Sequence, residues 1–274
     1  MLVFPNAKLN LGLYVTERRP DGFHTLESVF VPLPWTDALE LLPAPVGQPE
    51  TSITLTGRPI PGDPATNLCV RAYALLQADF PQLPAVQLYL HKIVPIGAGL
   101  GGGSADAAFA LKAANELFGL KLTVESLESY ARRLGSDCAF FIRNKPVLAV
   151  ERGDVFEEID LNLAVTACVV VYPNLHIGTA EAYACIRPQQ PAHSLRAALA
   201  QPISTWRGTV SNDFETALTP GYPVLAEIKQ QLYAAGAAYA SLSGSGSAVY
   251  GLWANGEPAA TTWPVGYTVW QGVL

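Results

Sequence analysis

The feature that most constrains this chain is a cluster of five glycines within the seven residues 97–103. It follows an alternating apolar stretch, Val86 to Ile93, that is typical of a strand, and it precedes an Ala-rich stretch, Ser104 to Phe118, that predicts a helix. Glycine loses more conformational entropy on folding than any other residue, and a tight turn needs only one or two glycines. The loop therefore favours a site where an anionic ligand approaches the backbone and the first N–H groups of the helix.

Two familiar glycine motifs fit this loop poorly. Gly97, Gly99 and Gly102 satisfy the G-x-G-x-x-G pattern, which in dinucleotide-binding folds is followed by a second parallel strand ending in an acidic residue. Residues 116–122, ELFGLKL, lead instead into another helical pattern. The loop also lacks the G-K-[ST] ending of a Walker A loop, so a lysine for the phosphates has to come from another segment. An NAD-dependent oxidoreductase stays an alternative, which predicts binding of NADH.

Composition narrows the class of protein. The 274 residues suggest one large or two modest domains at about 150 residues per domain. The net charge of -6 disfavours nucleic acid as a partner, because binding a phosphate backbone needs a concentrated basic field. The chain starts without a basic segment and apolar core of the secretory kind, and it has no apolar run of the ~18 residues that span a bilayer. We expect a cytoplasmic, soluble protein without a membrane segment.

The cysteines form no C-x-x-C pair, so we expect small buried core residues and no metal site among them. They are Cys69, Cys138, Cys168 and Cys185.

The first segment, Ala7 to Thr16, alternates strictly and predicts a strand. One face carries Leu9 and Leu11, and the opposite face places Lys8 and Asn10 side by side, roughly 6–7 Å apart along the strand. A turn at residues 19–22 and a second strand pattern make this a hairpin-like start.

The remaining patterns predict two α+β lobes with a boundary near residue 155. Residues 42–66 are expected to be mostly loop. Residues 188–202 are expected to form a long surface connection. Further strands are predicted at residues 26–33, 52–55, 147–150, 165–172 and 248–253. Further helices are predicted from Thr66 or Asn67 to Asp79, between Thr123 and Gly135, and at residues 224–235.

Several segments together resemble the GHMP kinases, and the similarity spans almost the whole chain. They read PNAKLNLGLYV, RPDGFHTLESVF, NLCVRAYALL, KIVPIGAGLGGGSADAA, LGSDCAFFI, SNDFE and SLSGSGSAVYG. The DGFHTL segment points to the member that phosphorylates a cytidine diphosphate derivative of methylerythritol in the non-mevalonate isoprenoid pathway, not to homoserine or mevalonate kinases. The resemblance implies a two-lobed α+β fold with an uncommon left-handed βαβ crossover. Residues 1–155 would form a lobe like ribosomal protein S5 domain 2, and residues 156–274 a ferredoxin-like lobe.

The resemblance also implies a catalytic pair, Lys8 and Asp137. Asp137 would take the proton from the substrate hydroxyl, and Lys8 would hold that carboxylate and the transferring phosphate. A positioned base typically contributes ~10²–10⁴-fold in rate. From the residues alone, Lys8 is equally well a solvated strand lysine, and Asp137 an N-cap of the next turn.

For the substrate, the resemblance implies that Phe23 and Tyr183 stack on a cytosine ring while His24 hydrogen-bonds to it. Base stacking on aromatic side chains is worth ~1–3 kcal/mol. Asn10 and Thr179 would contact the methylerythritol and diphosphate groups. From the residues alone, the two aromatic rings are ordinary core residues and His24 a turn residue.

The ligands implied by the resemblance are ATP and Mg²⁺, with a small-molecule acceptor and a monomeric or homodimeric protein. The segment 243–247 would pack against the glycine loop. One departure from the family stands out, because Ala105 replaces the second of two usual serines and leaves the metal ligands unknown. The residues expected near the nucleotide are Asn67, Lys92, Pro95, Ile96, Gly97, Ala98, Gly99, Leu100, Gly101, Gly102, Gly103, Ser104 and Ala105.

Two further alternatives remain at this point. One is another GHMP kinase or the related diphosphomevalonate decarboxylase, which would not require a cytidine group. The other is a nucleotide-binding module that has kept the loop and lost turnover.

Overall fold

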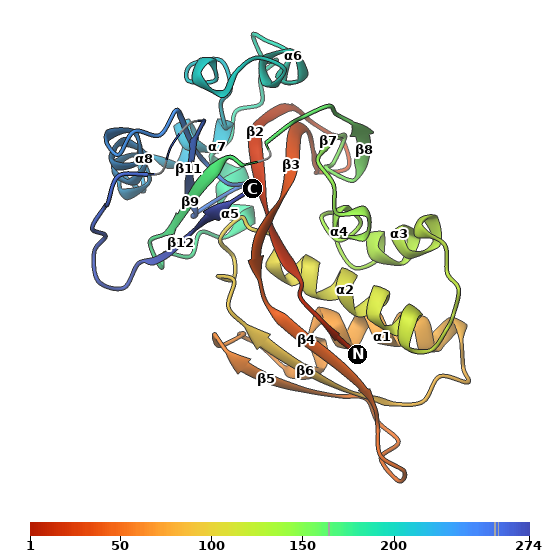
Figure 1. The fold of residues 1–274 in the computed structure, drawn as a ribbon. Helices are drawn as coiled ribbons and strands as arrows, with labels where there is room; N and C mark the ends of the chain where they lie inside the picture. Colours follow the sequence, from red (N-terminus) through yellow and green to blue (C-terminus); the bar gives the residue numbers. More distant parts are fainter. Residues whose placement is uncertain (164, 255, 257) are drawn as a thin grey trace. The chain divides into compact units, whose positions relative to one another are not determined.

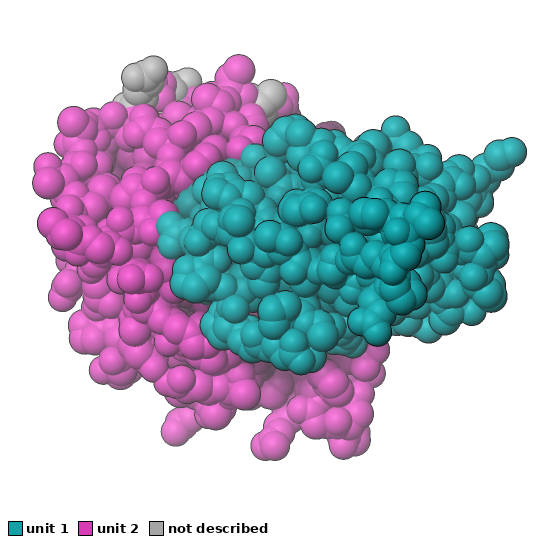
Figure 2. All heavy atoms as spheres, turned by 90° about the horizontal axis from the view of Figure 1, so that it is seen from below, with its two compact units in different colours: residues 1–7, 35–96, 101–145 teal, residues 8–34, 97–100, 146–274 magenta. Residues whose placement is uncertain are grey.

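The computed structural model describes residues 1–163, 165–254, 256 and 258–274. The chain forms two compact units that alternate along the sequence (Figure 2). Unit 1 comprises residues 1–7, 35–96 and 101–145, and unit 2 comprises residues 8–34, 97–100 and 146–274. The glycine loop contributes residues to both units. The lobe boundary at residue 155 stays a prediction.

Unit 1 is a four-stranded sheet with helices along one side (Figure 1). The strand order is β1-β4-β6-β5, in which only the β5–β6 pair is parallel. The strands are β1 (Leu2–Val3), β4 (Ala38–Pro43), β5 (Ser52–Gly57) and β6 (Val86–Lys92). The helices are η1 (Pro64–Thr66), α1 (Leu68–Asp79), α2 (Gly102–Leu117), α3 (Val124–Arg132) and α4 (Phe140–Arg143).

The helices of unit 1 begin where the sequence supplies caps. The Asn67 side chain accepts the N–H of Cys69 at the start of α1, and the Thr123 side chain accepts the N–H of Ser126 at the start of α3. Helix α2 buries mainly alanines, whose small side chains let it pack closely against α1.

Unit 2 contains two four-stranded sheets, ordered β2-β3-β7-β8 and β10-β11-β9-β12. The first two residues of β2 and the last two of β3 belong to unit 1. The strands are β2 (Asn6–Arg18), β3 (His24–Thr36), β7 (Val147–Val150), β8 (Val155–Glu158), β9 (Ala167–Tyr172), β10 (Tyr239–Leu242), β11 (Val249–Trp253) and β12 (Thr268–Val273). The helices are α5 (Thr179–Cys185), α6 (Leu195–Leu199), η2 (Ile203–Thr205), α7 (Asp213–Leu218) and α8 (Val224–Ala234).

The core of unit 2 forms where α7 and α8 cover the second sheet. Leu225, Ile228 and Leu232 lie on one face of α8 at helical spacing and are buried with Phe214 and Trp253.

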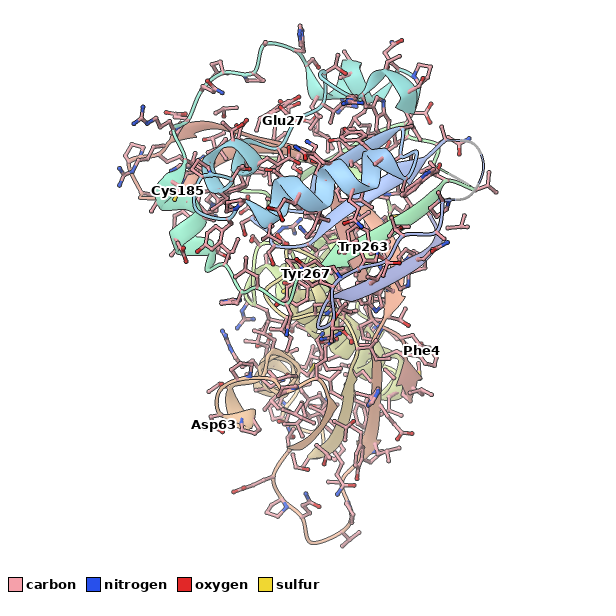
Figure 3. The ribbon with its side chains drawn as sticks, turned by 90° about the vertical axis from the view of Figure 1, so that its left-hand side faces the viewer. Phe4, Glu27, Asp63, Cys185, Trp263 and Tyr267 are labelled. Carbon is pink, nitrogen blue, oxygen red and sulfur yellow. The ribbon has the colours of Figure 1, made fainter. Side chains whose placement is uncertain are left out.

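Most predicted elements are confirmed, and two expectations are wrong. The segment 42–66 is mostly loop as expected, and its predicted strand is confirmed with two further residues, ending at Gly57. The segment 188–202 contains α6, which buries Leu195 and Leu199. Cys185, at the end of α5, is exposed (Figure 3), whereas the other three cysteines are buried as predicted. Within the described part of the chain, no helix combines the length and apolar character that crossing a bilayer requires.

Candidate active site

The glycine loop joins β6 to α2 with a backbone that only glycine adopts readily. Gly97, Gly99 and Gly101 have φ angles of 65°, 76° and 70°, in the left-handed region that L side chains disfavour. Helix α2 begins at Gly102, two residues earlier than predicted. Gly101 precedes it and makes no side-chain cap, and the first-turn N–H groups of a helix have no partner within that helix. This geometry suits the binding of a phosphate group.

The part of the loop in unit 2 is held by the segment 243–247. A Cβ added to Gly99 would lie 1.9 Å from the carbonyl oxygen of Ser243. The Ser243 hydroxyl donates to the Gly99 carbonyl at 2.9 Å, and the N–H of Ala248 donates to the Ala98 carbonyl at 3.1 Å. The expected packing of this segment against the glycine loop is confirmed.

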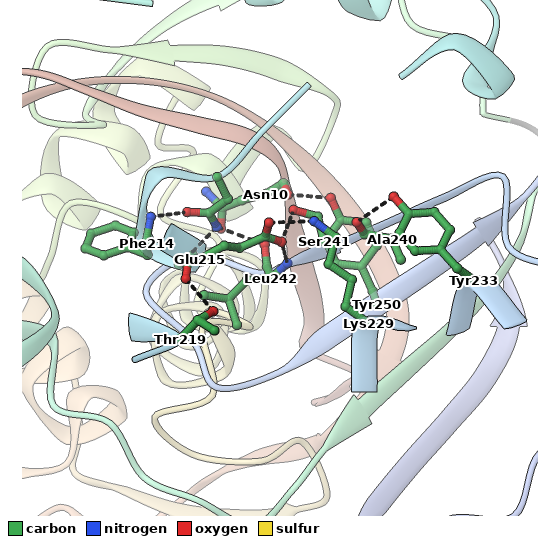
Figure 4. A network of polar contacts seen from close by, with 12 residues as sticks. Asn10, Phe214, Glu215, Thr219, Lys229, Tyr233, Ala240, Ser241, Leu242 and Tyr250 are labelled. Carbon is green, nitrogen blue, oxygen red and sulfur yellow. Dashed lines mark hydrogen bonds and ion pairs between the residues drawn. The ribbon is translucent and has the colours of Figure 1, made fainter. Parts of the chain in front are cut away.

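A partly buried polar network holds the segment 243–247 in turn (Figure 4). The side-chain amide of Asn212 donates to the carbonyls of Leu242 and Gly244 at 2.9 and 2.8 Å. The Glu215 carboxylate accepts the N–H of Leu242 at 2.7 Å and pairs with Lys229 at 2.6 Å. The SNDFE motif therefore stabilises the SLSGSGS motif, although the two are well separated in sequence.

Lys8 lies next to the glycine loop within unit 2. Its N–H donates to the Leu100 carbonyl at 2.9 Å. Its ammonium donates to Asn10 Oδ1 at 2.5 Å and lies 4.7 Å from the centre of the Phe30 ring. The two side chains share one strand face as predicted, and because Lys8 is only 4% exposed, the alternative of a solvated strand lysine is wrong.

Asn10 is anchored by its own contacts, so it orients the Lys8 ammonium. Its side-chain amide donates to Ser28 Oγ at 2.8 Å, and Ser28 donates to the Gly12 carbonyl at 2.6 Å. The Tyr250 hydroxyl donates to the Asn10 carbonyl at 2.8 Å.

Asp137 lies in the turn between α3 and α4 of unit 1 and is partly exposed. The next residue, Cys138, is buried, and its thiol lies close to Ser104 in the first turn of α2. Burial raises the pKa of the Cys138 thiol to about 11, so this side chain stays neutral. The Asp137 turn therefore lies beside the helix that follows the glycine loop.

Each unit thus connects one member of the expected catalytic pair to its own part of the loop. Unit 2 does so through Lys8 and Leu100, and unit 1 through Cys138 and Ser104. The convergence of Lys8 and Asp137 on one substrate stays a prediction.

Lys92, expected near the nucleotide, is buried between two carboxylates of unit 1. Its ammonium lies 2.5 Å from Asp37 and 2.7 Å from Asp106. Asp37 Oδ1 also accepts the N–H groups of Ile93 and Val94 at 2.5 and 2.8 Å. The cluster therefore connects the chain that enters the glycine loop with the helix that leaves it.

Burial and the neighbouring charges shift the pKa values of this cluster in opposite directions. Burial alone would lower the pKa of Lys92, but the two carboxylates outweigh it and raise that pKa. Burial also raises the pKa of Asp106 to about 7, against the effect of Lys92. Asp37 and Asp106 have no assigned role in the sequence-based prediction. The sequence nonetheless sets Asp37 apart, because it is the single charged residue in the stretch VPLPWTDAL.

The other residues expected at the nucleotide differ in exposure. Gly97 and Gly103 are exposed, and a Cβ added to Gly103 would meet nothing within 4 Å. Ala105 is fully buried, so the position of the missing serine belongs to the interior of unit 1. Among the described residues, no three His, Cys, Asp or Glu side chains gather in a way that could hold a metal ion.

The residues expected at the cytosine all lie in unit 2. Phe23 is 57% exposed at the turn between β2 and β3, and His24 begins β3. The His24 ring stacks on Tyr183 of α5, with the centroids 4.9 Å apart and the planes 26° apart. Thr179 is exposed at the start of the same helix. Burial, with a smaller effect of Arg18, lowers the pKa of His24, which favours a neutral ring with one donor and one acceptor.

The fold and the glycine loop define a phosphate-binding enzyme class, and comparison with known proteins identifies it. The model of the GHMP kinases N terminal domain matches residues 67–145, and that of the GHMP kinases C terminal domain matches residues 195–262. The chain belongs to the GHMP kinases. The expected GHMP kinase fold is confirmed, and the alternative of an NAD-dependent oxidoreductase is wrong.

Within this family, the chain is most informatively compared with curated relatives named 4-diphosphocytidyl-2-C-methyl-D-erythritol kinase. The one from Bacteroides fragilis is 51% identical over 94% of this chain and 93% of the relative. The one from Cytophaga hutchinsonii is 47% identical over 92% of each. A crystal structure of 4-(cytidine 5'-diphospho)-2C-methyl-D-erythritol kinase shares 33% identity, with a TM-score of 0.75 over 92% of this chain and 90% of that one.

Proposed function

We propose that this chain transfers the terminal phosphate of ATP to the 2-hydroxyl of 4-diphosphocytidyl-2-C-methyl-D-erythritol, a step of the non-mevalonate isoprenoid pathway. The observation that carries the proposal is the set of relatives that bear the name of this kinase. One of them is 44% identical and another 51% identical, and each alignment covers more than nine-tenths of this chain. The expected cytosine residues Phe23, His24 and Tyr183 support the same substrate.

The reaction requires a base and a stabilised phosphoryl group. The Asp137 carboxylate takes the proton of the 2-hydroxyl, whose oxygen forms a bond to the γ-phosphorus of ATP. The bond from that phosphorus to the β–γ bridging oxygen breaks, and ADP leaves. The Lys8 ammonium, oriented by Asn10, counters the negative charge of the transferring group.

The nucleotide is bound by the glycine loop. The open backbone at Gly103 and the first-turn N–H groups of α2 receive the phosphates. Mg²⁺ arrives as part of the ATP substrate, since its coordination by phosphates and water needs only one or two protein oxygens.

The test is release of ADP with a panel of acceptors. We expect ADP only with the cytidine diphosphate substrate and not with homoserine or mevalonate. ADP formed with another acceptor would reassign the substrate. ATP binding without ADP formation on any acceptor would favour the non-catalytic module.

The role of Asp137 is tested by Asp137→Asn. This variant should lose most of kcat, roughly 10²–10⁴-fold, while binding ATP with unchanged affinity. Asp160→Asn, a change at an exposed aspartate outside the expected site, is the control and should keep full activity. Full activity of Asp137→Asn would remove Asp137 as the base.

A cytoplasmic location and a monomer or homodimer that binds no nucleic acid complete the proposal. They rest on the negative net charge and on the family.

A further inference from the structure

The exposed ring of Phe23 is held in place by its own turn. The N–H of Phe23 donates to Asp21 Oδ1 at 3.0 Å, and the Phe23 carbonyl accepts the N–H of Arg19 at 2.8 Å. A single exposed apolar side chain is normal on a protein surface and needs no function. What requires an explanation is that both backbone groups of this residue are fixed while the residue remains 57% exposed.

A second turn supplies a cation to one face of that ring. The turn between β7 and β8, residues 151–154, places the Arg152 guanidinium 5.3 Å from the centre of the Phe23 ring. Asp154 accepts a hydrogen bond from Arg152 at 3.1 Å and so fixes the direction of the guanidinium. A guanidinium at this distance interacts favourably with the face of an aromatic ring.

The two turns are also joined directly, and these contacts hold Arg152 beside Phe23. Arg19 pairs with the Glu151 carboxylate at 2.5 Å, and the N–H of Leu26 donates to the Glu151 carbonyl at 2.7 Å. Glu151 has a φ of 59°, a left-handed conformation that disfavours a non-glycine residue. This turn therefore keeps an unfavourable backbone geometry in which Glu151 and Arg152 both contact the β2–β3 turn.

We propose that Arg152 is a positioning residue for the cytosine base, acting through Phe23. The guanidinium covers one face of the Phe23 ring, and the opposite face receives the base. The ring is thereby kept in one orientation before the substrate binds, which reduces the entropy lost on binding. This inference rests on the proposed role of Phe23 in binding the cytidine substrate.

The substitution Arg152→Lys distinguishes the effect of the planar guanidinium from the effect of its positive charge. A planar guanidinium stacks on an aromatic face, whereas the compact ammonium of lysine acts only as a point charge. Arg152→Lys should therefore recover only part of the affinity that Arg152→Ala loses.

The experiment measures binding of cytidine and of cytidine diphosphate to the full chain by calorimetry. We expect Arg152→Ala to weaken both ligands by a similar factor, about two- to fivefold, because an exposed cation–π contact is worth this much. Arg207→Ala is the matched control, because Arg207 lies 4.3 Å from the Tyr233 ring in a pair of the same kind, and it should bind both ligands like the unmodified protein.

Three outcomes would overturn the inference, and each identifies a different failure. Unchanged binding by Phe23→Ala would remove the base site itself. Weaker binding by Phe23→Ala but not by Arg152→Ala would leave the site in place and remove Arg152 from it. A loss by Arg152→Ala for cytidine diphosphate but not for cytidine would assign Arg152 to a phosphate.

Discussion

The Lys92 ammonium lies 2.7 Å from the Asp106 carboxylate, and these two buried side chains stand on opposite sides of the glycine loop in the sequence. Asp37 completes the cluster, which therefore holds two acids and one base. One oxygen of Asp106, Oδ1, has no hydrogen-bond partner among the described residues. Burial favours the protonated form of this carboxyl group, which agrees with its raised pKa.

Asp106 should make stability depend on pH. Its pKa rises from 3.8 to about 7, mainly by burial, so between these values the folded protein binds a proton more tightly than the unfolded chain does. The stabilisation is full below the unfolded pKa and is lost as the pH rises through about 7, with a slope of at most about 1.4 kcal/mol per pH unit. Urea unfolding between pH 5 and pH 8 should show this decline.

Asp106→Asn should flatten that decline, because the amide does not titrate and still accepts a hydrogen bond from Lys92. The other ionisable side chains that act on Asp106 are Lys92 and Asp37, and the Asp106→Asn variant retains both. Equal slopes for Asp106→Asn and the unmodified protein would contradict the assignment.

Lys92→Met should strongly destabilise unit 1. The change leaves two carboxylates buried without their cation, and removal of one partner of a buried ion pair costs about 3–5 kcal/mol. Lys145→Met, at an exposed lysine, should change the free energy of unfolding by less than about 0.5 kcal/mol. A Lys92→Met protein as stable as the Lys145→Met protein would show that the cluster contributes little.

Gly99→Ala and Gly103→Ala should separate the structural from the binding role of the loop. Gly99→Ala should cost at least about 1–3 kcal/mol, because its Cβ meets Ser243 at 1.9 Å and its φ is 76°. Gly103→Ala should be neutral or stabilising, since its Cβ meets nothing and alanine favours a helix. The same variant should raise the KM for ATP several-fold. An unchanged KM would mean that no phosphate approaches Gly103.

His24 should make the KM for the cytidine substrate depend on pH. Because burial lowers its pKa below 6.5, the ring is neutral at pH 7 and above, where the KM should be constant. The KM should rise as the pH falls below 6.5, because a protonated ring no longer accepts a hydrogen bond. In His24→Asn the KM for the cytidine substrate should not change with pH over this range. The KM for ATP serves as the internal control. A rise that persists in His24→Asn would assign the titration to another group.

The sequence by itself determined the elements and the class of enzyme. Strict alternation in residues 7–16, the cap at Asn67 and the glycines at 97–103 are local features, and each specifies a backbone conformation without help from distant residues. For this reason β2, α1 and the glycine loop could be predicted. The motifs in their order along the chain were also sufficient to indicate a GHMP kinase.

Only the tertiary structure decided which polar groups meet. Lys92 is expected near the nucleotide from the sequence, and the structure shows that its charge is matched by Asp37, 55 residues earlier, and by Asp106. Arg152 and Phe23 are likewise far apart in the chain and meet because two turns are joined. Such pairings depend on strand order and packing across long sequence separations, and no local pattern encodes which distant charge or ring will be adjacent.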